Sequence, residues 1–158
     1  MEVRFVQDGN MEIMQIDDAR LIYRNFTGRG DRYNREGDRN FSVVIPDAET
    51  ADLIASRGYR VKVKPPREEG EDPFITLPVK LKFNDRGPLV YLVSNGKQQR
   101  LTLETAGMID HIDIVTVNLD IRPYDWVVNG DTGRTAYLQS IQVFQKCDRF
   151  ATHEYDEY

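Results

Sequence analysis

Residues 20–45 read RLIYRNFTGRGDRYNREGDRNFSVVI, in which two apolar runs flank a loop of arginine, aromatic and glycine residues. The second run, residues 41–45, has the aromatic and β-branched composition of a strand. It pairs naturally with a first strand that ends near residue 26. We therefore predict a hairpin whose connecting loop is long and rich in charge.

The composition of this loop suits single-stranded nucleic acid. Arginine supplies charge and a flat stacking surface, aromatic rings support unpaired bases, and glycine lets the backbone close around an irregular chain. Asp31, Glu36 and Asp38 partly neutralise the arginines, so a solvated hairpin tip explains the same composition equally well. The DNA-binding candidates from this segment are Arg24, Phe26, Arg29, Arg32, Tyr33, Arg35 and Arg39.

The net charge of -5 hides a segregation of charge along the chain. Residues 20–64 hold ten Lys or Arg against six Asp or Glu, and residues 74–100 hold five against one. The remaining segments are acidic. A basic groove inside an acidic protein is therefore compatible with this sequence.

Two segments alternate apolar residues with lysine or arginine. Residues 59–64 read YRVKVK, which places Tyr59, Val61 and Val63 on one face of a strand, expected to face the core, and the cations on the other. Residues 79–83 read VKLKF and repeat the pattern. An exposed strand face kept soluble by charge gives the same alternation. The lysines that we assign to DNA binding are Lys62, Lys64, Lys80 and Lys82.

The chain reads as about seven strands and one short helix, after a short acidic lead. A long first strand covers residues 11–26, with an irregularity at Asp17 and Asp18. Asp47 can cap a helix over residues 48–57. Asn95 and Gly96 favour a tight hairpin. We predict a mainly β fold, an OB-type, partly open β-barrel with one short helix and extended hairpin loops.

Aromatic residues gather near the last turn. Pro123 is expected to end the strand over residues 112–122, because proline cannot donate to a strand ladder. Tyr124 and Trp126 follow, just before a turn cluster at residues 129–133. Rings beside a turn can stack on unpaired bases. Tyr124 and Trp126 therefore complete the set of DNA-binding candidates.

Few residues with catalytic or metal-binding chemistry are present. Cys147 is the only cysteine, which excludes an internal disulfide and a cysteine-cluster zinc site. The two histidines are His111 and His153, and no phosphate-binding glycine motif occurs. We predict no enzyme, no cofactor and no metal. Without an apolar run of about 18 residues or a signal peptide, a cytoplasmic protein is expected.

Residues 148–158 lose all periodicity and end in HEYDEY. Too little apolar material is present for this segment to pack by itself. We therefore divide the chain into a nucleic-acid-binding domain over residues 1–147 and a flexible acidic C-terminal tail over residues 148–158.

Taken together, the chain resembles the phage-encoded single-stranded DNA-binding proteins. The resemblance rests on RNFTGRG (24–30), FSVVIPD (41–47), GYRVKVK (58–64), PYDW (123–126), AYLQSIQVFQ (136–145) and the tail HEYDEY (153–158). It implies an OB-fold replication protein that binds and protects single-stranded DNA without sequence preference during phage replication or recombination in the bacterial host cell. It also implies that the tail recruits replication proteins such as a polymerase or helicase, through Asp156, Glu157 and Tyr158.

Several alternatives stay open at this point. The sequence does not rank DNA against RNA, identify the protein that the tail contacts, or decide between a monomer and a homodimer. A phage structural or assembly module built from β-strands would also carry arginine-rich loops and buried aromatics. A nuclease-like enzyme is disfavoured because no cluster of catalytic side chains can be identified.

Overall fold

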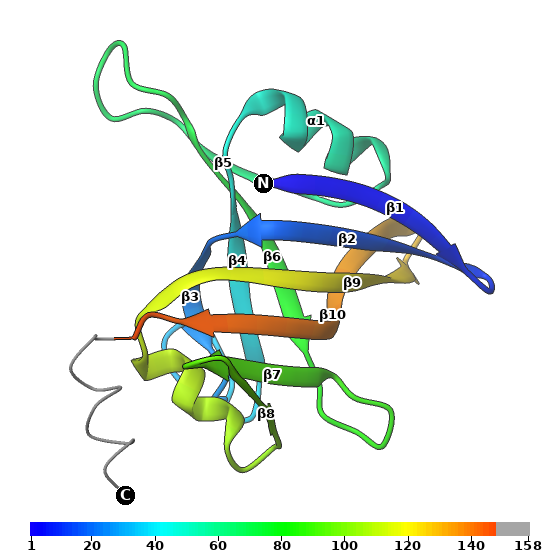
Figure 1. Ribbon diagram of the computed structural model, residues 1–158. Coiled ribbons are helices and arrows are strands. Elements are labelled where there is room, and N and C mark those ends of the chain that lie inside the picture. Colours follow the sequence, from blue (N-terminus) through cyan, green and yellow to red (C-terminus); the bar gives the residue numbers. More distant parts are fainter. Residues whose placement is uncertain (148–158) are drawn as a thin grey trace, which may run out of the picture.

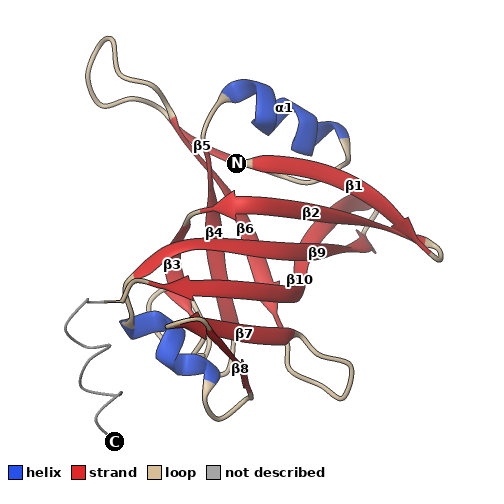
Figure 2. Cartoon of the chain, viewed as in Figure 1, coloured by secondary structure: helices blue, strands red, loops and turns tan. Residues whose placement is uncertain are grey.

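Ten strands, one α-helix and one 3-10 helix make up residues 1–147, the part of the chain that this computed structural model describes (Figures 1 and 2). In chain order they are β1 (Glu2–Asp8), β2 (Met11–Ala19), β3 (Leu21–Asn25), β4 (Arg39–Ile45), α1 (Ala48–Ser56), β5 (Lys62–Lys64), β6 (Phe74–Leu81), β7 (Leu89–Ser94), β8 (Lys97–Leu101), η1 (Ala106–His111), β9 (Ile114–Val128) and β10 (Asp131–Gln145).

All ten strands belong to one strongly bent sheet with the order β1-β2-β9-β10-β6-β4-β3. β5 adds to β6, and the β7–β8 hairpin adds to β10 (Figure 1). One edge of β10 pairs with β9. Its other edge pairs in parallel with β6 at Ala136 and Tyr137, and then with β7 from Ser140 to Phe144. The sheet is not closed. The strands and the one short α-helix confirm the predicted mainly β protein.

The predicted first strand is divided into β2 and β3 at Arg20. The irregularity expected at Asp17 and Asp18 is confirmed, because the pairing with β9 shifts register between Ile16 and Ala19 and Asp18 has a φ of 56°. The bend redirects the chain from β9 to β4. The pairing of β3 with β4, predicted from the two apolar runs, is also confirmed.

Two other boundaries differ from the prediction. The acidic lead forms β1, which pairs with β2 along its whole length. Pro123 does not end its strand, since β9 continues to Val128 and Pro123 faces Ala136 of β10. Beyond Ile121, β9 pairs with β10 and has no register partner in β2, so Pro123 lies on a free edge where its missing N–H costs little.

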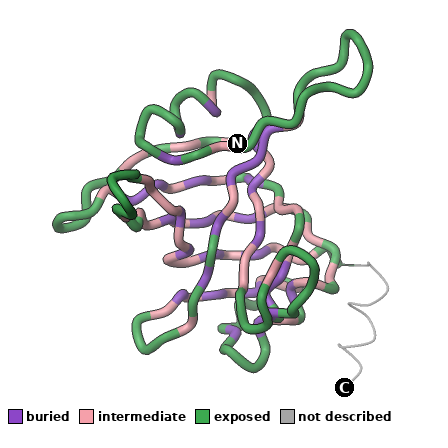
Figure 3. The backbone as a smooth tube through the Cα atoms, turned by 180° about the vertical axis from the view of Figure 1, so that it is seen from behind, coloured by how far each residue is buried: buried purple, intermediate pink, exposed green. Residues whose placement is uncertain are grey.

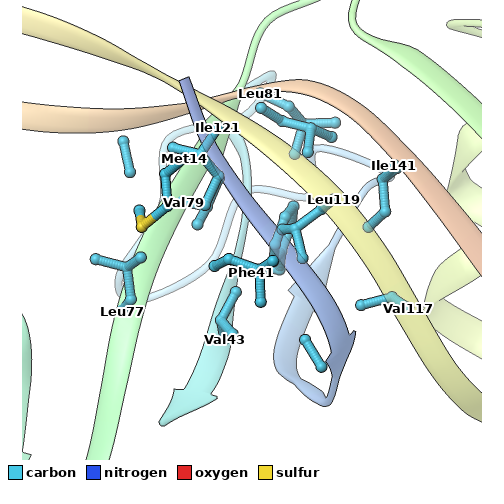
Figure 4. Close-up of a cluster of buried hydrophobic side chains, with 14 of the residues drawn as sticks. Met14, Phe41, Val43, Leu77, Val79, Leu81, Val117, Leu119, Ile121 and Ile141 are labelled. Carbon is cyan, nitrogen blue, oxygen red and sulfur yellow. The ribbon is translucent and has the colours of Figure 1, made fainter. Parts of the chain in front are cut away.

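The core lies inside the curved sheet. Phe41, Val43 and Ile45 of β4 are buried at alternate positions and meet the buried side chains of β2, β6 and β9 (Figure 4). α1 adds Ala51 and Ile54 to this core. Figure 3 shows the purple, buried positions alternating with partly exposed ones along the strands. This alternation leaves the outer side chains of β4 and β6 free to form a surface.

The helix is confirmed and β5 is shorter than predicted. The Asp47 side chain accepts a hydrogen bond from the Thr50 amide at 2.7 Å, so it caps α1 as expected. Tyr59 is buried, but Val63 is 58% exposed, so the expectation that Val63 faces the core is wrong. β5 pairs only with the first three residues of β6 and no layer covers its apolar side.

Candidate nucleic-acid interface

Asn25 organises the base of the loop over residues 26–38, which joins β3 to β4. This side chain is buried. Its Oδ1 accepts hydrogen bonds from the amides of Gly28 (3.0 Å) and Arg29 (2.9 Å). Its Nδ2 donates to the carbonyls of Arg29 (3.1 Å) and Asp38 (3.3 Å). One buried amide therefore holds both sides of the loop together.

Asp110 of η1 fixes the same loop from outside. Its Oδ1 accepts a hydrogen bond from the Phe26 amide at 2.7 Å. Its Oδ2 accepts from the Thr27 amide at 3.0 Å and from the Thr27 hydroxyl at 2.7 Å. Hydrogen bonds to an ionised group are stronger than neutral ones. The start of the loop is therefore attached to η1 by three such bonds.

Arg24 also connects β3 to this segment. Its half-buried guanidinium donates from Nη1 to the carbonyls of Ile109 (2.7 Å) and Ile112 (2.8 Å). This engagement makes Arg24 a positioning residue for the loop, and contact with DNA stays a prediction for it.

The loop tip holds Tyr33 out into solvent. The Asp31 carboxylate accepts hydrogen bonds from the amides of Tyr33 and Asn34, both at 2.8 Å, and these bonds hold the pKa of Asp31 below its usual value. Asn40 of β4 donates to the Asn34 side chain at 2.8 Å. The Tyr33 ring is 84% exposed, and the Arg32 guanidinium lies 5.8 Å from its centroid. A rigid turn thus presents a flat aromatic surface.

Three adjoining hollows follow the outer face of β4 and β6. The first lies between the loop and Phe83, the second lies beside β3, and the third lies between β5 and the β9–β10 hairpin. Lys80 lines all three and Lys62 lines two. We call this continuous surface the groove. Its main cationic and aromatic side chains are Arg24, Arg29, Tyr33, Arg39, Lys62, Lys80, Lys82, Phe83, Trp126 and Tyr137, and the carboxylates of Asp31 and Asp38 also line it.

A row of side chains crosses the sheet at the centre of the groove. Lys80 of β6 is the register partner of Asn40 on one side and of Tyr137 on the other. Tyr137 in turn faces Arg122 of β9, whose guanidinium lies 5.1 Å from the Tyr137 ring centroid. Four neighbouring strands therefore place an amide, an ammonium, an aromatic ring and a guanidinium in line.

Arg39 is an unneutralised cation in the first hollow. Its guanidinium lies 5.2 Å from the Phe83 ring centroid. Its Nε is buried and has no hydrogen-bond partner, and within residues 1–147 no carboxylate forms an ion pair with it. Gly28, at φ 79°, leaves room for this side chain, because a Cβ there would lie 3.2 Å from its Cγ and Nε. Arg39 is thus fixed by stacking and retains donors for an anion.

Trp126 and Gly133 form the wall of the third hollow. They are register partners, and a side chain at Gly133 would overlap the indole ring. Trp126 is therefore held against the backbone of β10 with one side half-exposed. Tyr124, 54% exposed, contacts the edge of Tyr137 at a centroid distance of 5.8 Å.

Arg134 fixes the far end of the same hollow. Its Nε and Nη2 donate to the Asp125 carboxylate at 2.7 and 3.0 Å, which lowers the pKa of Asp125. Its Nη1 donates to the Arg57 carbonyl at 2.7 Å. Tyr59 lies beneath this guanidinium, and burial raises the Tyr59 pKa to about 12. Arg134 is thus held by the protein itself.

The predicted residues fall into distinct positions. Those that line the groove are Arg24, Arg29, Tyr33, Arg39, Lys62, Lys80, Lys82 and Trp126. The structure leaves Arg32, Arg35 and Lys64 exposed outside it, and Tyr124 beside Tyr137.

Phe26 requires a correction. The structure buries it completely, stacked parallel to Phe41 at 5.2 Å, so its ring is inaccessible to a base. The sequence pointed to the loop as a whole and could not separate a ring that turns inward from one that turns outward.

Several groove residues were missed from the sequence. Tyr23, Phe83, Arg122 and Tyr137 lie in or beside the hollows, yet each sits within or next to a strand and looked like ordinary sheet composition. Only the pairing of β10 with β6 brings Tyr137 to Lys80. The lysine alternation at residues 79–83 was the available signal for this face of β6.

The tail lies outside the described residues, as do Asp156, Glu157 and Tyr158. Within residues 1–147 no group of three or more His, Cys, Asp or Glu side chains could hold a metal ion. No helix in that part of the chain is long and apolar enough to cross a membrane.

A mainly β domain with a basic, aromatic groove is the type of protein that binds single-stranded nucleic acid. The chain belongs to the family described as "Putative phage ssDNA-binding domain", whose model matches residues 4–157. This is a family of non-catalytic DNA-binding proteins, and the chain is accordingly not an enzyme. No curated protein matches the sequence.

Solved structures of one phage protein share the fold. The single-stranded DNA-binding protein from bacteriophage Enc34 aligns with a TM-score of 0.57 at 10% identity, covering 95% of this chain and 93% of that one. Its C-terminal truncation aligns at 0.52 and 10% identity, covering 93% and 97%. The same protein in complex with ssDNA aligns at 0.48 and 11% identity, covering 92% and 96%.

Replacing Phe26 and Tyr33 separates the inner ring from the outer one. We expect Phe26→Ala to lower the free energy of unfolding by about 3–5 kcal/mol, because it empties a fully buried site. Tyr33→Ala should leave stability within about 0.5 kcal/mol, since the ring is exposed. Urea denaturation measures both. A small loss for Phe26→Ala would contradict its placement in the core.

Asp110→Asn should loosen the loop without disturbing the sheet. An amide can offer only one oxygen to the three donors, so we expect faster hydrogen exchange at Phe26 and Thr27 and about tenfold weaker binding of single-stranded DNA. Exchange mass spectrometry and fluorescence anisotropy measure these changes. Asp113→Asn, an exposed neighbour, is the matched control. Unaltered exchange at the loop in Asp110→Asn would exclude the role assigned to this carboxylate.

Proposed function

We propose that the protein binds exposed single strands of phage DNA along the groove, without sequence preference. The observation that carries this proposal is the position of Lys80 at the junction of the three hollows, with Tyr33, Tyr137 and Trp126 around it. Cations contact the backbone of any sequence, and every base has a face that can stack on an aromatic ring. A groove of this composition therefore binds strands rather than particular bases.

We further propose that the sheet is an OB-type, partly open barrel. Supporting this, β2 and β3 are separated only by Arg20, so the chain itself bridges the gap between the two ends of the path β2-β9-β10-β6-β4-β3. OB-folds bind oligonucleotides on the face of their second and third strands and on two loops. The corresponding parts here are the face of β4 and β6, residues 26–38 and the β9–β10 turn.

In the cell, this activity would protect single strands during phage replication or recombination in the cytoplasm of the bacterial host. The acidic tail would recruit replication proteins such as a polymerase or helicase, with Asp156, Glu157 and Tyr158 as contact residues. Support for the tail comes from its sequence alone, because acid and terminal aromatics suit a docking peptide. RNA is a further ligand to test, since charge and stacking do not require a deoxyribose.

Lys62→Gln combined with Lys80→Gln should weaken single-strand binding and its dependence on salt. Each lost phosphate contact lowers the slope of log K against log salt by about 0.7 for a single strand, so the double variant should lose about 1.4. Anisotropy titrations with labelled single-stranded DNA, duplex DNA and RNA at several salt concentrations measure this slope. Lys97→Gln with Arg100→Gln, on β8 outside the groove, is the matched control. Equal affinity of the wild type for duplex would contradict the proposal.

Deleting residues 148–158 should tighten binding at low salt. The tail carries Asp148, Glu154, Asp156 and Glu157, which resemble a phosphate backbone, and a tether of about ten residues presents them at millimolar effective concentration. Screening weakens the competition as salt rises. Anisotropy at low and high salt compares the truncated chain with a full-length variant whose four tail acids are amides. A truncated protein that binds no better at low salt would leave docking as the only role of the tail.

A further inference from the structure

A fourth hollow lies beyond the groove, between the loop after β6 and the outer faces of β9 and β10. Lys82, Arg86 and Arg122 line it, together with Asn84, Gln139 and apolar side chains. None of the residues that line it is an Asp or Glu. Among residues 1–147, none of these three cations forms an ion pair. Two guanidinium groups and one ammonium group therefore give this hollow a positive charge.

The loop that carries Arg86 is held in a defined shape. The Asn84 amide donates to the Gly87 carbonyl at 2.8 Å, and the Gly87 amide donates back to the Asn84 carbonyl at 3.2 Å. The Arg86 amide donates to the Asn84 side chain at 2.9 Å. Asp85, the carboxylate of this turn, is exposed and does not line the hollow. Arg86 thus extends from a fixed turn.

This hollow is continuous with the groove. Lys82 lines both it and the first hollow of the groove. Arg122 lies over the ring of Tyr137, which lines that first hollow. β10 passes from β6 to β7 between Tyr137 and Ser140, and this change of partner opens the sheet where the loop leaves it. A DNA strand bound along Lys80 and Lys82 therefore reaches Arg86.

We infer that Lys82, Arg86 and Arg122 form an extension of the binding site that holds the phosphates of the single strand as it leaves the groove. The inference rests on the proposed function. No aromatic side chain lines this hollow, so it offers charge and no stacking surface for a base. Its ligand is a phosphate group, and its continuity with the groove makes the source a phosphodiester backbone rather than free phosphate.

The test is a length series of labelled oligo-dT with the full chain. The wild type should gain affinity with length until both the groove and the extension are filled. Arg86→Gln, which lies outside the groove, should match the wild type on the shortest oligonucleotides that bind. On the longest, the slope of log K against log salt should fall by about 0.7, which changes the ratio of affinities at 0.1 M and 1 M salt about fivefold. Adding Arg122→Gln should bring the fall in slope on the longest oligonucleotides to about 1.4, and because Arg122 stacks on Tyr137 this double variant is not used for the shortest ones.

Lys97→Gln with Arg100→Gln removes the same charge from β8 and should leave the length dependence unchanged. Inorganic phosphate at matched ionic strength should compete no better than chloride, whereas stronger competition would identify a site for free phosphate and overturn the inference. An Arg86→Gln variant that equals the wild type at every length, or that loses affinity equally at the shortest length, would also overturn it. A wild type that binds no oligonucleotide would overturn the proposed function itself.

Discussion

The change of partner along one edge of β10 determines how the binding surface is arranged. Up to Tyr137 this edge pairs with β6, and from Ser140 it pairs with β7. The pairing with β9 on the opposite edge shifts register at the same point, between Leu138 and Ser140. At Lys80, β6 is still paired on both sides, with Asn40 and Tyr137, and the Lys80 side chain points out of the sheet into the groove. β6 ends at Leu81, so Lys82 and the loop that carries Arg86 leave the sheet beside β10. The row through Lys80 therefore depends on the pairing of β10 with β6, and the hollow at Arg86 depends on where that pairing ends.

A second constraint is the division of aromatic rings between the two sides of the sheet. Phe26 and Tyr33 belong to one loop, yet the first is fully buried and the second is 84% exposed. The hydrogen bonds of Asn25 and Asp110 fix the backbone between them, so the loop cannot rotate to exchange the two rings. Burial of Phe26 against Phe41 stabilises the fold. Because the loop is already anchored by this contact, little conformational entropy is lost when Tyr33 binds a base.

Local patterns predicted what depends on local chemistry. The cap at Asp47, the turn at Asn95 and Gly96, and the outward position of Lys80 on β6 each follow from a few neighbouring residues, and the structure has them. Features that depend on distant pairing were not accessible. Pro123 continues a strand because β2 no longer pairs beside it, and Tyr137 reaches the groove because β6 lies next to β10. The inward position of Phe26 also depends on a distant residue, because the Phe26 amide donates to Asp110, which is 84 residues further along the chain.

The pairing of cations explains how an acidic chain can attract a polyanion. Within residues 1–147, ion pairs neutralise Arg4, Arg57 and Arg134 through Asp17, Glu12 and Asp125, at 2.7 Å in each case. Lys62, Lys80 and Lys82 are in no such pair. The electric field of a neutralised pair is small beyond about 10 Å, the screening length at 0.1 M salt. The fields of unpaired cations along one groove add together. The net charge of -5 therefore describes the whole chain, and an approaching strand meets a local surface of the opposite sign.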